Sequence, residues 1–298
     1  MVILETKPGR LANRTFYFAY FIANAIEYGY RLYNPPFAEY ADLFPAMANQ
    51  KRIAGYPIYV QLPQNALFRY FYPRLHFHLP RLDTRNRWHW RLQVTDEYDL
   101  NQADFTRAAR TKICWPNGWM FRDHANLVKY RETIRDVFTP IPAVMTHAQQ
   151  AVEQCRKSSS DAVVVGVHIR RTDYAEFLGG RYLFSLEQYA GFMRDFVRHW
   201  SHERRIDFLI CSDEVIDLQI FEGLAVRQSR GSAIEDLYTL AHCDYLLGPP
   251  STFSMWASYW GQVPLCMLTD TQKEIRPEEF QKILSMDHFA DGSSFRHG

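Results

Sequence analysis

The 298-residue sequence lacks the short motifs that identify several common enzyme classes. It contains no G-x-x-x-x-G-K-[ST] and no G-x-G-x-x-G, which excludes a P-loop and a dinucleotide-binding fingerprint. Without G-x-S-x-G, it also lacks the nucleophile elbow of α/β-hydrolases. No D-x-D occurs, so the usual carboxylate ligands for a metal–diphosphate complex are missing.

Charge imbalance, long apolar runs and paired cysteines are also missing. The net charge of +1 gives no general attraction to nucleic acid. Only three apolar residues follow Met1, which predicts neither a signal peptide nor a membrane-spanning helix. The five cysteines form no C-x-x-C pair, and we expect them to be small buried residues in a reducing compartment rather than disulfides. We therefore predict a cytoplasmic protein.

The C-terminal half alternates β-branched runs with segments of helical periodicity, which predicts a parallel, doubly wound α/β sheet. Such sheets bind ligands beyond the carboxyl ends of their strands. The expected strands are residues 162–169, 206–211, 224–227, 245–248 and 264–268, and the expected helices are residues 185–200, 215–221, 233–242 and 252–260.

The N-terminal half begins in the same style and then becomes irregular. We expect a strand at 2–4, a helix at 15–28 and a strand at 30–33. Residues 35–142 are rich in aromatic, proline and arginine residues, and the polar segment 154–161 is the predicted linker. The sequence thus predicts two α/β lobes, 1–154 and 155–298.

Two adjacent arginines follow the strand VVVGV, in the sequence HIRRTD. Holding Arg170 and Arg171 together at a strand end is costly without an anion, because like charges repel. An arginine fork binds phosphate oxygens through two parallel hydrogen bonds. The alternative is that Asp173 and surface acids neutralise both arginines.

Two further loops are predicted to lie at ligand-binding edges. Ser251, Thr252 and Ser254 stand where a strand leads into a helix, and helix N-termini attract anions. Capping of that helix alone would explain one of these hydroxyls. Gly9 to Arg14 form the first strand-to-helix loop, which is either an ordinary turn or a contact to a donor molecule.

The aromatic segment 68–90 offers faces on which sugars could stack, although aromatic residues more often form core. His76 and His78 are two residues apart, so on a strand they would share one face and could bind a metal ion. No third ligand has suitable spacing. We therefore predict no metal site.

These motifs resemble those of a known enzyme superfamily. HIRRTDY is similar to the H-x-R-R-x-D motif of the α-1,2-, α-1,6- and protein-O-fucosyltransferases, and GRLANRTF to their G-R-[LF]-[GA]-N-Q motif. The segment 235–261 resembles their third block. The pattern is most similar to the bacterial α-1,2-fucosyltransferase family, over residues 9–34 and 162–268.

The resemblance implies a GT-B fold, with two Rossmann-like lobes of parallel sheet and a central cleft. Residues 1–154 would form the acceptor lobe and 155–298 the nucleotide-sugar lobe. The implied reaction is metal-independent and inverting, and moves L-fucose from GDP-fucose to a hydroxyl of a glycan, with an α-1,2 linkage to galactose, in polysaccharide biosynthesis. No cofactor is expected beyond the donor, and the partners are the donor and the acceptor glycan, not nucleic acid.

Site residues carry over from the resemblance position by position. Arg170 matches the β-phosphate ligand, and Asn13 with Arg10 matches contacts from the N-terminal lobe near the reacting centre. Arg14 replaces the family's usual Gln, Thr172 its usual Gly, and Pro249-Pro250 is also unusual. The remaining positions implied are His168 and Asp236 near the guanine and Ser251 and Thr252 at the phosphate turn.

The general base and the donor stay open. Asp173 is predicted as catalytic, with Glu176, an acid of the N-terminal lobe, or no dedicated base as alternatives. Rival functions are the same fold using another nucleotide sugar, and an inactive glycan- or nucleotide-binding module.

Overall fold

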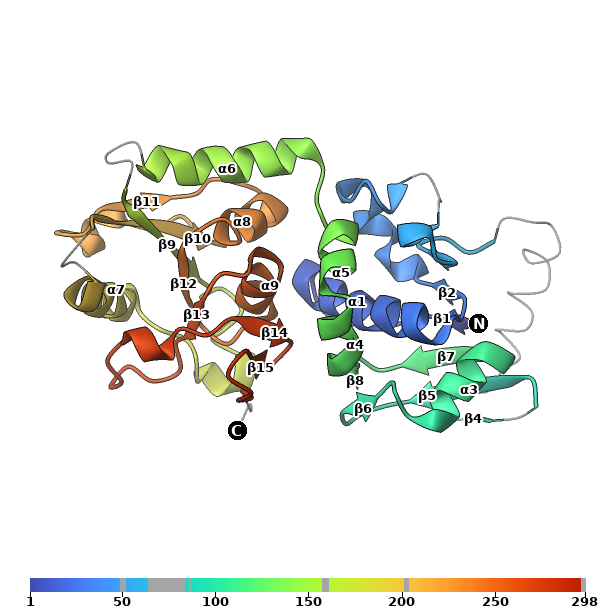
Figure 1. Ribbon diagram of the computed structural model, residues 1–298. Coiled ribbons are helices and arrows are strands. Elements are labelled where there is room, and N and C mark those ends of the chain that lie inside the picture. Colours follow the sequence, from blue (N-terminus) through green and yellow to red (C-terminus); the bar gives the residue numbers. More distant parts are fainter. Residues whose placement is uncertain (49–51, 64–83, 86, 157–160, 201–203, 296–298) are drawn as a thin grey trace. The chain divides into compact units, whose positions relative to one another are not determined.

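The computed structural model describes residues 1–48, 52–63, 84–85, 87–156, 161–200 and 204–295. The chain divides into two compact units, Met1–Ile141 and Pro142–Gly298, seen in Figure 1. Among the described residues, no helix is both long and apolar enough to cross a membrane.

The second unit is built around a five-stranded parallel sheet. Helices separate its strands along the chain, and a small antiparallel pair follows the last strand. Its elements are α6 (Pro142–Arg156), β9 (Val163–Ile169), η4 (Phe177–Gly180), α7 (Leu186–Trp200), β10 (Ile206–Ser212), η5 (Leu218–Phe221), β11 (Val226–Gln228), α8 (Ala233–Leu240), β12 (Tyr245–Gly248), α9 (Thr252–Gly261), β13 (Leu265–Met267), η6 (Pro277–Glu279), β14 (Ile283–Ser285) and β15 (His288–Phe289).

The strands and helices predicted for this half are confirmed, apart from small shifts at their ends. Residues 218–221 form a 3-10 turn rather than an α-helix. The boundary between the units lies before α6, not at 154/155 as predicted. This helix packs on α8, β9 and β10, and its Val144, Ala148 and Val152 are buried there, so the polar residues at its end do not mark the division.

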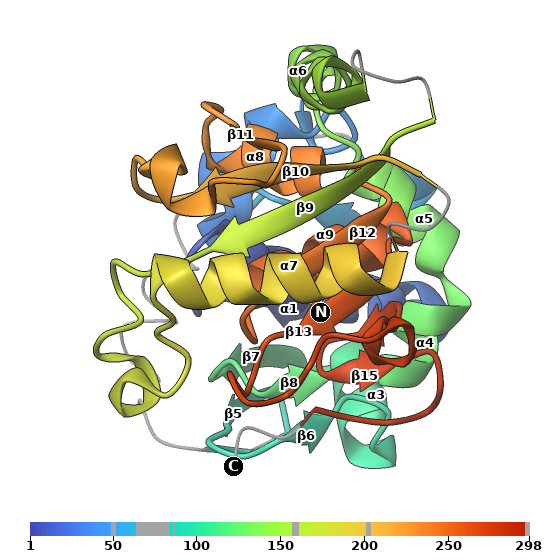
Figure 2. The ribbon, with the colours of Figure 1, turned by 90° about the vertical axis from the view of Figure 1, so that its left-hand side faces the viewer.

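The strand order β11-β10-β9-β12-β13 places a topological switch between β9 and β12. The chain leaves β9 through α7 on one face of the sheet and reaches β12 through α8 on the other, as Figures 1 and 2 show. Open α/β sheets bind ligands at such a point, beyond the carboxyl ends of the two strands. The HIRRTD and PPST segments both begin there.

The faces of β9 follow strict alternation. Val165, Val167 and Ile169 belong to the hydrophobic core that α7 covers. Gly166 faces α8, where a Cβ atom would lie 2.8 Å from the Leu240 side chain and 2.9 Å from Cys243 Sγ. Because the chain stays extended just after β9, successive side chains there also point to opposite faces of the sheet.

The first unit holds a six-stranded sheet in the order β3-β2-β1-β7-β5-β4, parallel except at β4. Its described elements are β1 (Val2–Ile3), α1 (Leu11–Tyr28), β2 (Leu32–Tyr33), η1 (Pro35–Leu43), η3 (Ile53–Gly55), β3 (Ile58–Tyr59), β4 (Thr84–Arg85), β5 (His89–Gln93), β6 (Tyr98–Asp99), α3 (Ala103–Thr111), β7 (Ile113–Asn117), β8 (Phe121–Arg122), α4 (His124–Lys129) and α5 (Arg131–Val137).

Helix α1 is buried over most of its length and begins four residues earlier than predicted, because Leu11 and Ala12 are already in the core. The loops after β1 and β7 meet at the carboxyl edge of this sheet. The Thr6 hydroxyl donates to Asn117 Oδ1 (3.2 Å), and the Gly118 amide donates to the same hydroxyl (3.1 Å).

All five cysteines are buried, as predicted, and none of them forms a disulfide. Burial raises the pKa of the Cys114 thiol to about 11 and that of Cys266 to about 12, so both remain protonated thiols at neutral pH.

The close approach of α8 to β9 predicts the effect of two glycine substitutions. Gly166→Ala should lower the free energy of unfolding by about 1–3 kcal/mol, because the added methyl group overpacks this contact. Gly191→Ala on α7 is the matched control, since its Cβ meets nothing within 4 Å, and it should stabilise by up to about 1 kcal/mol. Urea denaturation measures both, and equal stability of the two variants would contradict this packing.

Candidate active site

The carboxyl ends of β9 and β12 bring two predicted segments together in the second unit. His168 and Arg170 share one face of the chain leaving β9, and that face is directed toward α9. His168 Nδ1 lies 2.7 Å from Ser254 Oγ, and Arg170 Nη1 lies 3.5 Å from Ser251 Oγ. The arginine motif and the serine-rich turn therefore form one site.

Arg170 is held from the side by Asp173. Its Nε donates to Asp173 Oδ1 (2.8 Å) and its Nη2 to Asp173 Oδ2 (2.5 Å), in a two-pronged geometry. This hydrogen bonding raises the pKa of Arg170 above its usual value. The guanidinium also lies over the Tyr174 ring, 5.2 Å from its centre. The charge is thus fixed in orientation before any ligand arrives.

Arg171 points away from this site, as alternation along an extended chain requires. Its Nε lies 3.4 Å from Glu214 Oε1, beyond the end of β10. The neighbouring Thr172 hydroxyl donates to Asp213 in the same loop. Of the two arginines, only Arg170 is placed toward α9.

His168 is buried and uncharged. Burial, with the charge of Arg170 as the second cause, lowers the pKa of His168 to about 3. Its ring packs on Phe253, with 4.9 Å between ring centres. At neutral pH the imidazole therefore acts as a hydrogen-bonding group, not as a cation.

Ser251 and Thr252 open helix α9. Ser251 is the buried N-cap residue, and its hydroxyl accepts a hydrogen bond from the Phe253 amide (3.3 Å). Thr252 is the first residue of the helix. The first amides and the dipole of a helix favour an anion at this end.

Asp236 lies in the first turn of α8, the helix that follows the loop after β11 at the same edge of the sheet. The Ser229 hydroxyl donates to its Oδ1 (2.5 Å). Burial raises the pKa of Asp236 to about 6, although the bond from Ser229 and the nearby His147 oppose the rise. This carboxylate is therefore poised to change charge just below neutral pH.

Arg10 and Asn13 lie in the first unit, at the start of α1. Arg10 is the N-cap residue of that helix, and the backbone of Gly9 is left-handed (φ 47°). This left-handed conformation favours glycine, and a Cβ at Gly9 would also lie 2.1 Å from Asn13 Nδ2, so Asn13 would have to move. Arg14, where the family usually has Gln, forms an ion pair with Glu39 and donates to the Gly9 carbonyl (3.1 Å).

Sequence reasoning missed the support that Tyr174 gives to this site. Its hydroxyl donates to the Pro250 carbonyl (2.8 Å), which ties the loop after β9 to the turn before α9. The signal was present, since Tyr174 ends the HIRRTDY motif and Pro250 precedes Ser251. Residues 68–83 and 86 of the aromatic segment, with His76 and His78, lie outside the described residues.

Two kinds of comparison bear on the family. The model of glycosyl transferase family 11 matches residues 67–274. Galactoside alpha-(1,2)-fucosyltransferase 1 of Saimiri sciureus is 27% identical over 192 residues, covering 60% of this chain and 50% of the relative. Galactoside 2-alpha-L-fucosyltransferase SEC1 of Bos taurus is 24% identical over 234 residues, covering 74% and 60%. The chain thus spans about half to three fifths of these relatives.

Solved structures share the fold. A variant of Arabidopsis thaliana FUT1 in complex with GDP superposes with a TM-score of 0.60 at 14% identity, covering 99% of this chain and 76% of that one. The fucosyltransferase NodZ from Bradyrhizobium gives a TM-score of 0.54 at 17% identity, covering 90% and 95%. The predicted GT-B fold is confirmed by these likenesses. Because the family model covers more than half of the sequence, the chain belongs to glycosyl transferase family 11.

Proposed function

We propose that this protein is an inverting fucosyltransferase that moves L-fucose from GDP-fucose to a hydroxyl of a glycan, forming an α-1,2 linkage to galactose. The observation that carries the proposal is the Arg170 guanidinium, fixed by Asp173 beside the N-terminus of α9. The names of the relatives support the sugar and the linkage, since the two described above are named as galactoside α-1,2-fucosyltransferases.

Arg170 has the geometry to bind a diphosphate. Asp173 takes the Nε hydrogen and one Nη2 hydrogen, and Ser251 Oγ accepts from Nη1 at 3.5 Å, which leaves one Nη1 hydrogen and the second Nη2 hydrogen. Those at the end of the fork are spaced to bind two phosphate oxygens. The first amides of α9 supply further donors beside it.

The same arrangement supports a metal-independent reaction without a cofactor. Negative charge grows on the β-phosphate as the bond to fucose breaks, and positioned donors stabilise that charge. A fixed guanidinium and a helix N-terminus take the role that a D-x-D-bound metal has elsewhere. Attack by the acceptor hydroxyl from the opposite side of the anomeric carbon inverts its configuration.

Asp236 is the proposed guanine ligand, and neutral His168 with Ser254 forms the wall of the donor site. A carboxylate accepts two N–H bonds from the guanine edge and rejects bases that lack those donors. Arg10 and Asn13 are proposed to contact the donor from the first unit, which would bind the acceptor. We also propose a cytoplasmic role in polysaccharide synthesis. The cytoplasmic location is supported by the five cysteines, which form no disulfide.

The mechanism predicts a large effect of substituting Arg170. Arg170→Ala should lower kcat about 30- to 1,000-fold, which corresponds to about 2–4 kcal/mol of lost transition-state stabilisation. Arg170→Lys should also be badly impaired, because lysine keeps the charge and loses the fork. Steady-state kinetics with GDP-fucose, run with EDTA present, measure both variants. Arg171→Ala is the control. Because Arg171 contacts Glu214, this substitution should lower the melting temperature at least as clearly as it lowers kcat.

Near-normal turnover in folded Arg170→Ala protein would contradict the mechanism. Loss of wild-type activity in EDTA that Mn²⁺ restores would contradict metal independence.

Because Asp173 pairs side-on with Arg170, it could orient the arginine rather than act as a base, and an experiment can separate these two roles. If Asp173 orients Arg170, Asp173→Asn should slow hydrolysis of GDP-fucose without acceptor and transfer to acceptor by similar factors. A base that deprotonates the acceptor would instead affect transfer and leave hydrolysis near the wild-type rate. Comparing the two rates in one preparation decides between them, and loss of transfer alone would restore the catalytic role first predicted for Asp173.

The raised pKa of Asp236 predicts a pH dependence of nucleotide binding. Above about pH 6 the carboxylate is ionised and accepts guanine N–H bonds, and below about pH 6 protonation removes that ability. GDP affinity should therefore decrease as the pH falls below the pKa, by up to about tenfold per pH unit. Calorimetry of wild type and Asp236→Asn isolates this contribution from the titration of GDP. Parallel pH profiles with equal affinities would contradict the guanine assignment.

A further inference from the structure

A second group of polar and aromatic side chains lies at the carboxyl edge of the sheet in the first unit, outside the HIRRTD, PPST and GRLANR segments. The loop after β7 carries Trp119, and the loop after β5 carries Glu97. Gly118 lets these loops touch, because a Cβ there would lie 2.2 Å from the Val94 carbonyl oxygen (φ 118°). The short parallel pair β6–β8 then fixes the two loops side by side.

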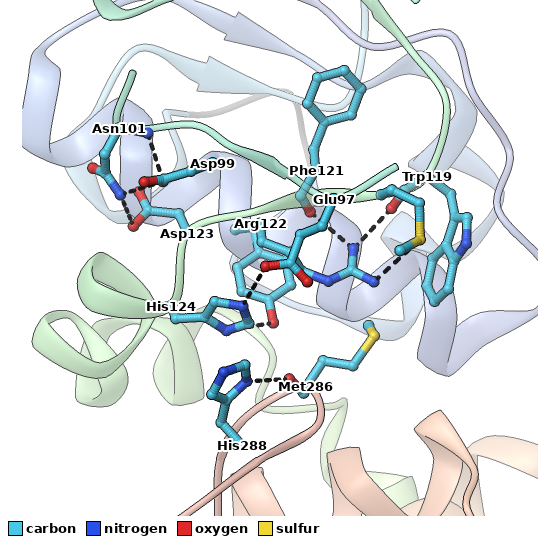
Figure 3. Close-up of polar contacts among 12 residues, drawn as sticks. Glu97, Asp99, Asn101, Trp119, Phe121, Arg122, Asp123, His124, Met286 and His288 are labelled. Carbon is cyan, nitrogen blue, oxygen red and sulfur yellow. Dashed lines mark hydrogen bonds and ion pairs between the residues drawn. The ribbon is translucent and has the colours of Figure 1, made fainter. Parts of the chain in front are cut away.

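Arg122, at the end of β8, holds Trp119 in place. It is only 3% exposed, and no acidic side chain in the described ranges pairs with it. Its Nη1 donates to the carbonyls of Trp119 (2.9 Å) and Phe121 (3.0 Å), and its guanidinium lies 4.7 Å from the centre of the Trp119 ring. Figure 3 shows this arginine between the tryptophan and Glu97. A buried cation is costly, and here its contacts orient one partly exposed indole.

Hydrogen-bonding groups lie on the other side of Arg122 from that indole (Figure 3). His124 Nε2 lies 3.7 Å from Glu97 Oε1, and His124 Nδ1 lies 3.5 Å from the Tyr20 hydroxyl (Figure 3). The Glu97 side chain is 58% exposed and that of His124 is 26% exposed. The guanidinium of Arg122 also lies over the Tyr20 ring, so the two sets of side chains are joined through it.

We propose that Trp119, Glu97 and His124 form the subsite for the acceptor sugar, with Arg122 as the residue that positions Trp119. This inference rests on the transferase function proposed above. In galactose, the hydrogens on C3, C4 and C5 lie on one face of the ring, which makes that face apolar and suited to stacking on an indole. The hydroxyls at the ring's edge then meet the carboxylate and the imidazole, which accept and donate hydrogen bonds. Ligand sites commonly combine an aromatic wall with a few polar groups in this way.

The test measures acceptor and donor effects separately. Trp119→Ala should raise the KM for lactose about tenfold or more while the KM for GDP-fucose changes little. Glu97→Ala should shift the lactose KM in the same direction. Arg122→Lys should act through the indole, so that combining it with Trp119→Ala adds little to the single substitution. Saturation-transfer NMR with lactose and no donor should show binding to wild type that Trp119→Ala loses.

Two controls match these changes. Tyr56 is an aromatic residue that is 37% exposed and precedes β3, at the edge of the sheet opposite to Trp119. Asp96 is the exposed acid next to Glu97. Tyr56→Ala and Asp96→Ala should leave the lactose KM within about twofold of wild type.

The subsite is wrong if folded Trp119→Ala keeps its lactose affinity, or if it loses donor affinity to the same extent. Failure of the proposed function looks different. In that case the wild-type protein would transfer no fucose from GDP-fucose to any acceptor. The NMR titration would still report whether lactose binds at Trp119.

Discussion

The side-on pairing of Arg170 with Asp173 is the interaction on which the donor site depends. It fixes a guanidinium whose outer edge faces the N-terminus of α9. The pair itself forms within one loop, and because β9 lies beside β12, this loop lies next to the turn that opens α9. Tyr174 fastens the two segments through the Pro250 carbonyl. A preorganised charge of this kind needs little rearrangement when leaving-group charge develops.

Both units place their polar clusters at the carboxyl edges of their parallel strands. In the second unit these are the ends of β9, β11 and β12, and in the first unit the loops after β1, β5 and β7. The clusters differ in chemistry. The second unit presents a paired arginine and a helix N-terminus, which suit a diphosphate, whereas the first presents an indole with a carboxylate and an imidazole, which suit a sugar. This difference matches the two substrates of a glycosyl transfer.

Much of the second unit could be predicted from sequence because its signals are local. The run AVVVGVHI, the helical spacing after Ser185 and the caps of α8 and α9 each specify one element. Strand alternation also directs the Arg170 and Arg171 side chains to opposite sides of the chain. The pairing of Arg170 with Asp173 stayed open, because it forms in an irregular turn that no periodicity describes.

The first unit was less predictable for a physical reason. Its β6–β8 pair spans two residues per strand, too few for any alternation to be visible. Arg122 is buried in an irregular turn against Trp119 and against Tyr20 of α1, and no periodicity in the sequence marks it as different from the other arginines. The boundary between units was misplaced because the polar end of α6 resembles a linker, although the spacing of Val144, Ala148 and Val152 already indicated a buried helical face.

A crystal structure of the protein with GDP tests the central claim most directly. The account predicts that the β-phosphate binds the outer edge of the Arg170 guanidinium at the start of α9, with the side-on bonds to Asp173 kept and the guanine at Asp236. A diphosphate bound elsewhere, or held through a metal ion by carboxylates with Arg170 turned away, would contradict it.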